Sequence, residues 1–320
     1  MRTLLMPSRA VHLRSASSSF AHTVSSPVSL LSRLRAYLEL TRPANLVTAA
    51  ADVLAGFALA GLSHGRSLLP LLIAGVLLYA GGVVFNDVFD RELDAVERPE
   101  RPIPSGRASV RGAALLGTAL LVAGVASALA ASTWSAVIAA AIALLAVIYD
   151  RWGKRYAAVA PITMGACRGL NLLLGASALP AAVAESWFVG LIPLAYVGGI
   201  TALSRGEVRG GQIVTARIAT ALVVAAMVGV AILATLEFRI SWGAIPLLGL
   251  LAWRVLPPFA RANLCPADAS RIRSAVTAGG LSLIVLDAAI AAVYAGPLYG
   301  LMVLSLWVVA AGAARLFAVT

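Results

Sequence analysis

Apolar segments of about transmembrane length recur along the whole chain. A membrane-spanning helix needs about 20 mostly apolar residues to cross roughly 30 Å of hydrocarbon. None of these segments alternates apolar and polar residues as the strands of a membrane barrel do. The pattern predicts an all-α, polytopic membrane helical bundle of nine spans, or ten if the last two segments both cross. The segments are residues 45–62, 68–86, 112–131, 134–150, 160–180, 187–204, 214–235, 242–258, 274–295 and 298–317.

The composition agrees with a membrane protein. Of the 320 residues, 60% are hydrophobic and only 12% are charged, whereas an ordinary soluble domain has roughly a quarter of its residues charged. A chain this apolar cannot remain solvated without folding. The two cysteines and three histidines show no spacing typical of a metal site or a disulfide framework. These observations exclude a typical soluble enzyme, a disordered protein and a zinc-stabilised scaffold.

The net charge of +11 is unevenly distributed. Arginines gather in the loops that follow the second, fourth, sixth and eighth segments, which by the positive-inside rule face the cytoplasm or its organellar equivalent. Contact with anionic membrane lipid explains part of this charge. The chain has no soluble basic domain that would indicate nucleic acid as a partner. We expect an integral membrane protein of the bacterial inner membrane with its active site toward the cytoplasm, an organellar membrane being the alternative.

The amino-terminal residues have a different composition. The first 38 residues contain several arginines and serines and no acidic residue. This composition resembles an organellar transit peptide, and it also fits a bacterial amino terminus. We expect a flexible segment over residues 1–34 and one membrane-embedded domain over residues 35–320.

Acidic residues cluster at the end of the second segment. In a continuous helix, Asp87, Asp90 and Asp94 fall within a sector of about 60° on one face. Three like charges on one stripe repel each other, and no basic residue lies between them on that face. Mg²⁺ takes hard oxygen ligands through one or two carboxylates together with waters and phosphates. The stripe therefore indicates a magnesium site, the alternative being a solvated helix end.

A basic loop follows this acidic stripe. It carries Arg98, Arg101 and Arg107, and its prolines prevent continued helix. Arginines beside metal-binding carboxylates suit a polyanion such as diphosphate. For any single arginine, ordinary positive-inside charge is the alternative explanation.

Three motifs together resemble the UbiA family of intramembrane prenyltransferases, over roughly residues 35–295. The acidic stripe resembles the family's first aspartate-rich motif, and the loop after it is also similar. The end of the fourth segment resembles the tyrosine–aspartate–lysine motif, and the start of the first segment resembles a third, weaker one. The motifs are Asn86–Asp87–x–x–Asp90–x–x–x–Asp94, Tyr149–Asp150–x–x–x–Lys154 and Thr41–Arg42–Pro43–Ala44–Asn45, and the similar loop after the first motif is Arg101–Pro102–Ile103–Pro104–Ser105–Gly106.

The resemblance implies the roles of these residues. The carboxylates would hold Mg²⁺ that bridges the diphosphate of an isoprenyl donor, and the lysine would contact the same diphosphate. The tyrosine and aspartate of the second motif would arrange the wall of the diphosphate site. The asparagine of the third motif would project into the substrate cavity. The implied residues are Asp87, Asp90 and Asp94 for Mg²⁺, with Asn86 in the same cluster, Lys154, Asp150 and Tyr149 at the diphosphate, and Asn45 in the cavity.

The loop after the sixth segment departs from the family. The family usually has a second aspartate-rich motif there. Residues 201–211 contain a single acidic residue, Glu207, which lies between Arg205 and Arg209. Glu207 would then be a lone metal ligand while the two arginines bind phosphate oxygens, or the protein has another reaction or none. A solvated turn is the third reading. The loop also resembles a divergent UbiA-like subgroup, the EboC-like proteins.

Two polar residues lie within the fifth segment. An arginine there costs at least about 2.5 kcal/mol on insertion, so Arg168 should face the bundle interior and a partner. Asn171 lies one turn further on, and both are candidates for substrate binding or for a structural ion pair. Gly165 and Gly169 would let a neighbouring helix approach closely. The candidate partners of Arg168 are the diphosphate, Asp150 and Glu207.

The combined pattern predicts an enzyme. The leading hypothesis is a Mg²⁺-dependent transferase of prenyl groups from a prenyl diphosphate donor to a lipophilic acceptor, an aromatic compound being one candidate. A terpene cyclase or prenyl diphosphate hydrolase of the same fold is the first alternative. A transporter or assembly factor for an isoprenoid is the second. A transporter would carry acidic residues in midplane helices, whereas most acidic residues here lie at one interface.

Overall fold

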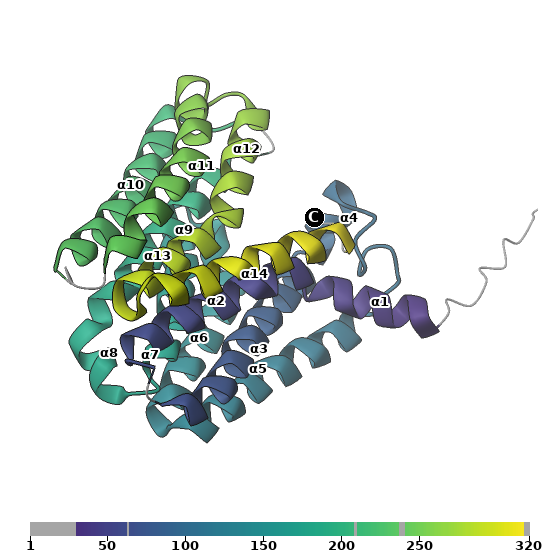
Figure 1. Ribbon diagram of the computed structural model, residues 1–320. Coiled ribbons are helices and arrows are strands. Elements are labelled where there is room, and N and C mark those ends of the chain that lie inside the picture. The colour runs from purple at the N-terminus through teal and green to yellow at the C-terminus, as the bar shows by residue number, and fades with distance from the viewer. Residues whose placement is uncertain (1–29, 63, 208–209, 237–240, 317–320) are drawn as a thin grey trace, which may run out of the picture.

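The computed structural model describes residues 30–62, 64–207, 210–236 and 241–316, and over these residues every regular element is a helix (Figure 1). The all-α class is therefore confirmed. Residues 1–29, most of the segment expected to be flexible, lie outside the described residues. The remaining residues of that segment, 30–34, belong to the first helix.

The helices follow one another with short connections. The bounds are α1 (Leu30–Leu40), α2 (Pro43–Leu59), α3 (Gly65–Phe89), α4 (Arg91–Glu97), α5 (Val110–Ala131), α6 (Thr133–Arg151), η1 (Gly153–Arg155), α7 (Val159–Ala176), α8 (Pro180–Ser186), η2 (Trp187–Gly190), α9 (Leu191–Ser204), α10 (Ile213–Leu236), η3 (Ser241–Gly243), α11 (Ala244–Leu264), α12 (Ala269–Leu281), α13 (Leu283–Ala295) and α14 (Pro297–Leu316).

Seven helical stretches among the described residues are long and apolar enough to cross a membrane. Helix α2 and the first 17 residues of α14 are apolar but shorter. The integral membrane class is thus supported, while the expected count of nine or ten spans is not confirmed. The seven stretches are Gly65–Phe89, Val110–Ala131, Thr133–Arg151, Val159–Ala176, Pro180–Ser204, Ile213–Leu236 and Ala269–Ala295.

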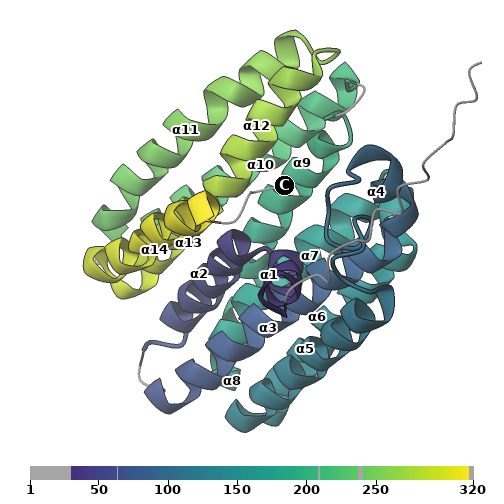
Figure 2. The same cartoon turned by 90° about the vertical axis from the view of Figure 1, so that its right-hand side faces the viewer.

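Helix α2 lies at the centre of the bundle. It packs against α7 on one side and against α13 and α14 on another. Figure 2 shows α10, α11 and α12 on one side of the molecule and α3, α5 and α6 on the opposite side. The α2–α7 contact is close because Gly56 and Gly175 have no side chain. A Cβ at Gly56 would collide with the backbone of Leu172, and one at Gly175 with that of Val53.

Helix α7 also packs against α9. Any Cβ at Gly165 would collide with the backbone of Leu194, and one at Gly169 with that of Gly190. The expectation that this glycine pair permits close helix approach is therefore confirmed. Because α7 is held tightly on both sides, its polar residues have fixed positions inside the bundle.

The second membrane helix does not continue through the acidic stripe. Helix α3 ends at Phe89, Asp90 lies between two helices, and α4 begins at Arg91. The continuous helix on which the single acidic stripe of Asp87, Asp90 and Asp94 depended is therefore not present. Asp90 has φ −91° and ψ 3° at the break, and its carboxylate pairs with a different basic residue from those of Asp87 and Asp94.

Candidate active site

The aspartates of the first motif divide into two groups with different basic partners. Nη1 of Arg101 lies 2.7 Å from Oδ2 of Asp94 and 3.3 Å from Oδ1 of Asp87. All three side chains are buried. Asp90 faces elsewhere and pairs with Lys154, the distance between Oδ1 and Nζ being 2.6 Å. The charges expected to need an external cation are thus balanced by basic side chains from other elements.

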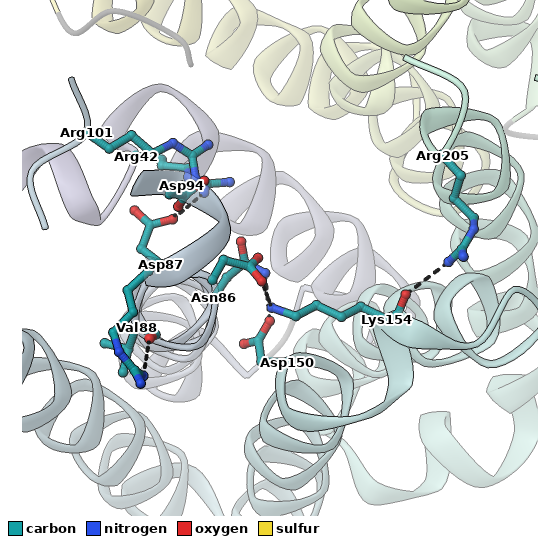
Figure 3. A network of polar contacts seen from close by, with 11 residues as sticks. Arg42, Asn86, Asp87, Val88, Asp94, Arg101, Asp150, Lys154 and Arg205 are labelled. Carbon is teal, nitrogen blue, oxygen red and sulfur yellow. Dashed lines mark hydrogen bonds and ion pairs between the residues drawn. The ribbon is translucent and has the colours of Figure 1, made fainter. Parts of the chain in front are cut away.

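Arg42 is a further basic residue at this site, and sequence reasoning did not assign it a role. Its Nη2 donates a hydrogen bond of 2.7 Å to Oδ1 of Asp87 (Figure 3). Arg42 has φ 49°, a left-handed conformation that is uncommon for a non-glycine residue. It precedes Pro43, which disfavours right-handed helix at this position. The only signal in the sequence was its place in the Thr41–Asn45 motif.

The tyrosine–aspartate–lysine motif meets the first motif in space. Nδ2 of Asn86 donates to Oδ1 of Asp150 at 2.9 Å, and Lys154 reaches across to Asp90. Figure 3 shows the Lys154 side chain extending from η1 toward Asn86 and Asp150. Arg205 supports this lysine from the loop after α9, because its Nη1 donates to the backbone oxygen of Lys154 at 3.0 Å. The ends of α3 and α6 therefore meet through these side chains, and Arg205 contacts the backbone of Lys154.

A cavity of about 220 Å³ opens beside this meeting point. It lies between α3, α6 and α7, with the Arg42 end of α2 at its rim. Asn86, Tyr149 and Asp150 line the end near the ion pairs, and Arg168 and Asn171 line the inner end. Asn45 is not among the lining residues, so the expectation that it projects into this cavity is not met. The lining residues are Arg42, Gly75, Leu78, Tyr79, Gly82, Val83, Asn86, Ile142, Ala146, Tyr149, Asp150, Met164, Cys167, Arg168 and Asn171.

The intramembrane arginine has a partner from the centre of the bundle. Nη1 of Arg168 donates to Oδ2 of Asp52 at 2.7 Å, and its Nη2 donates to Oγ1 of Thr48 at 2.6 Å. Its guanidinium carbon lies 4.7 Å from the centre of the Tyr79 ring. Asp52 is fully buried in α2. Arg168 is thus both a cavity residue and a member of a structural ion pair, with Asp52 in place of the expected Asp150 or Glu207.

The loop after α9 contacts α12 through Glu207. Burial raises the pKa of Glu207, and the positive charges of Arg98 and Arg273 act in the opposite direction. Nη2 of Arg273 donates to the backbone oxygen of Glu207 at 3.3 Å. Arg209 lies outside the described residues.

The acidic residues do not form a closed metal cage. Among the described residues, no group of three or more Asp, Glu, His or Cys side chains is arranged to hold a metal ion. The four expected ligands, which include Glu207, are therefore not brought together. Mg²⁺ in proteins needs only one or two carboxylates beside waters and phosphate oxygens. Asp87 and Asp94, which share Arg101, meet this smaller requirement for a metal that arrives with a phosphate ligand.

Comparisons with known proteins agree with this arrangement. Residues 47–271 match the model of the UbiA prenyltransferase family. Digeranylgeranylglyceryl phosphate synthase of Methanopyrus kandleri is 44% identical over 119 residues, which are 37% of this chain and 43% of that protein. The chain aligns with less than two thirds of the length of the curated relatives it matches.

Solved structures share the fold. A structure of digeranylgeranylglyceryl phosphate synthase superposes with a TM-score of 0.61 at 22% identity, covering 81% of this chain and 97% of that one. A UbiA homologue from Archaeoglobus fulgidus, bound to GPP and Mg²⁺, superposes with a TM-score of 0.50 at 16% identity, covering 84% and 99%. The family model spans most of the membrane domain and both motifs that meet at the cavity. The chain belongs to the UbiA prenyltransferase family.

Proposed function

We propose that the protein transfers a prenyl group from a prenyl diphosphate to a lipophilic acceptor within the membrane, with Mg²⁺ as cofactor. Family membership supports this activity. The curated relatives are named for the synthesis of digeranylgeranylglyceryl phosphate, and one family structure holds GPP and Mg²⁺. The finer assignment of an aromatic acceptor has no support from these relatives, whose named product is a prenylated glyceryl phosphate.

One observation carries the proposal. The first aspartate-rich motif and the tyrosine–aspartate–lysine motif meet at the end of a cavity inside a membrane bundle, through Lys154–Asp90 and Asn86–Asp150. A solvated helix end would not place Asp87 and Asp94 in buried contact with Arg101. A transporter site near the bilayer midplane would not gather these acids at the helix ends.

The charged residues suit a departing diphosphate. Arg42, Arg101 and Lys154 supply positive charge where negative charge develops on the leaving group. The fork of an arginine also matches phosphate oxygens in two-point contact. These cations already pair with aspartates. A bound diphosphate would take the place of the carboxylates beside the cations, and the carboxylates would then be free to bind a metal. Asp87 and Asp94 would hold Mg²⁺, and the metal would neutralise charge on the diphosphate.

The walls of the cavity suit the prenyl group of the donor. Leu78, Val83 and Ile142 line it together with small residues, and such a surface excludes water from a reactive allylic cation. Tyr149 and Asp150 would orient the donor beside Asn86. Glu207, Arg205 and Arg209 would complete the phosphate end from the second loop, with the arginines in place of a second acidic motif.

Purified protein in detergent tests this function. We expect Mg²⁺-dependent release of diphosphate from geranyl or geranylgeranyl diphosphate when a lipophilic acceptor is present, and loss of release with EDTA. Asp90→Ala should abolish release, whereas Asp268→Ala, which removes an exposed aspartate at the start of α12, should not. Absence of Mg²⁺-dependent turnover would refute the proposal, and a free alcohol or cyclised hydrocarbon without consumption of acceptor would favour the hydrolase or cyclase alternative.

The cellular membrane is also part of the proposal. The basic loops and the ion pairs lie at the same ends of α3, α6 and α9, so the positive-inside rule puts the diphosphate site on the cytoplasmic side. The curated relatives are archaeal and do not support the expectation of a bacterial inner membrane. The proposed site is therefore within the membrane and faces the cytoplasm.

A further inference from the structure

Two carboxyl groups lie close together at the centre of the bundle. Asp287 of α13 and Asp52 of α2 are both fully buried, and these two helices pack against each other. The carboxyl group of Asp287 lies within hydrogen-bonding reach of that of Asp52. Neither oxygen of Asp287 accepts a hydrogen bond from the described residues, and the same holds for Oδ1 of Asp52. The proposed function gives Asp287 no role.

The donors around this pair are directed to other acceptors. Nη1 of Arg168 donates to the other oxygen of Asp52, Oδ2, at 2.7 Å. The hydroxyl group of Tyr196, which lies near enough to Asp287 for their charges to interact, donates its one hydrogen to the backbone oxygen of Gly279 at 2.9 Å. The three oxygens without a partner therefore face each other with no protein donor between them among the described residues.

The charges at this place do not balance if both carboxyl groups are ionised. Arg168 pairs with Asp52, and its positive charge also acts on Asp287. Arg254 of α11 faces another group, because its Nε donates to Oγ of Ser282 at 3.2 Å. One guanidinium group is therefore matched with two buried carboxyl groups. An unpaired charge in the interior is strongly unfavourable, so two carboxyl groups that share a site retain one proton between them.

We propose that Asp52 and Asp287 share one proton, and that Asp287 is a positioning residue that acts through Asp52 on Arg168 in the wall of the cavity. A protonated carboxyl group donates one hydrogen bond, whereas an ionised one only accepts. With the proton on Asp287, its O–H group donates to Oδ1 of Asp52, and Asp52 stays ionised beside Arg168. The three side chains are then neutral as a set, and Asp52 is held from both sides. A role of Arg168 in catalysis rests on the proposed function, whereas the shared proton does not.

Infrared spectroscopy of the full chain detects this proton, because a protonated carboxyl group has a C=O stretching band that a carboxylate lacks. The chain is measured in dodecyl maltoside, a detergent without a carbonyl group, at a mildly alkaline pH at which exposed acidic side chains are ionised. Difference spectra between the unmodified chain and each variant isolate the band of this pair. Labelling of the aspartate carboxyl carbons with ¹³C should shift the band and so assign it to aspartate.

The charge balance gives a separate expectation for each variant. Asp287→Asn and Asp52→Asn should each remove the band, because a single acid then remains to balance Arg168 and is ionised. Arg168→Gln should double the band, because both acids then carry a proton. Asp268→Asn, which replaces an exposed aspartate at the start of α12, is the matched control and should leave the band unchanged.

A conservative substitution tests the hydrogen bond. Asn at position 287 keeps an N–H donor for Oδ1 of Asp52, whereas Leu has none. Asp287→Leu should therefore unfold at a lower temperature than Asp287→Asn, because an oxygen of a buried carboxylate is left without a donor. Equal unfolding temperatures of the two variants would contradict the positioning role of Asp287.

The outcomes distinguish this inference from the proposed function. A band that persists in Asp287→Asn or in Asp52→Asn would overturn the shared proton, as would an unchanged band in Arg168→Gln. If Asp52→Asn does not fold, the comparison of Asp287→Asn with Asp268→Asn still decides whether the proton is present. The expected bands in a chain without Mg²⁺-dependent diphosphate release would leave the shared proton standing and refute the transferase. Diphosphate release without these bands would do the reverse.

Discussion

Nζ of Lys154 lies 2.6 Å from Oδ1 of Asp90, which joins the loop after α6 to the junction between α3 and α4. Both side chains are largely but not fully buried, with about a fifth of each exposed. The Nζ atom itself is buried, so the pair closes the site beside the end of the cavity. This contact converts two separate sequence motifs into one site.

Lys154 is the only lysine in the sequence, and its Nζ atom is buried beside Asp90. We expect Lys154→Met to abolish Mg²⁺-dependent diphosphate release, because it removes the positive charge beside Asp90. Lys154→Arg keeps a positive charge there and should retain part of the activity. Equal loss of release in the two variants would contradict the assignment.

The buried guanidinium of Arg101 bridges two carboxylates, so its loss should cost more than the loss of either carboxylate charge. Arg101→Met leaves Asp87 with Arg42 alone and Asp94 without this partner, and removing one member of a buried pair typically costs about 3–5 kcal/mol. Asp94→Asn should cost less, because Asp87 still neutralises the arginine. Unfolding in detergent measures both values.

An exposed pair provides the comparison. Arg271 and Asp268 pair at 3.1 Å with about two fifths of each side chain exposed, and such pairs contribute roughly 0–1 kcal/mol. Arg271→Met should thus change stability far less than Arg101→Met. A similar loss in the two variants would show that burial of the Arg101 cluster contributes nothing.

The close contact of α2 with α7 should be sensitive to a single methyl group. Gly175→Ala places a Cβ against the backbone of Val53, and such overpacking typically costs about 1–3 kcal/mol. Gly249→Ala in α11 is the matched control, since a Cβ there has nothing within 4 Å among the described residues. Thermal unfolding should show a lowered midpoint for Gly175→Ala, whereas the midpoint of Gly249→Ala should not be lowered. A neutral result at Gly175 would mean that the two helices can separate without loss.

Glu207 should make stability depend on pH. Because burial raises its pKa in the folded state, the folded chain retains this proton over a range where the unfolded chain, with an ordinary pKa of about 4.3, has lost it. The resulting stabilisation is present at low pH and is lost as pH rises through the folded pKa. The difference in melting temperature between the unmodified chain and Glu207→Gln should therefore fall as pH rises above about 4.3. A difference that grows with pH would contradict the burial of this carboxylate.

The acidic stripe shows how far sequence reasoning reached. Asp87, Asp90 and Asp94 were correctly placed at a helix end and beside a basic loop, because their spacing and the prolines that follow are local features. Their partners were not predictable, since Arg42 and Lys154 come from segments far away in the chain. The break at Asp90 was missed because nothing in the sequence between Phe89 and Arg91 forbids a continuous helix.

Arg168 illustrates the same division inside the membrane. The cost of an intramembrane charge required a partner on another helix, and the sequence offered several acids at comparable plausibility. Close packing at Gly56 and Gly175 brings α2 against α7, and this contact selects Asp52. Asn45 was expected in the cavity, whereas Arg42, which has a left-handed backbone conformation, lines it.

The sequence by itself determined the membrane class, the helical architecture and the family, because hydropathy, charge asymmetry and short motifs are properties of neighbouring residues. Tertiary structure alone decided which charges meet and where the cavity lies. These depend on helix crossings and on the turn at Asp90, and contacts between distant segments carry no signature in a single sequence.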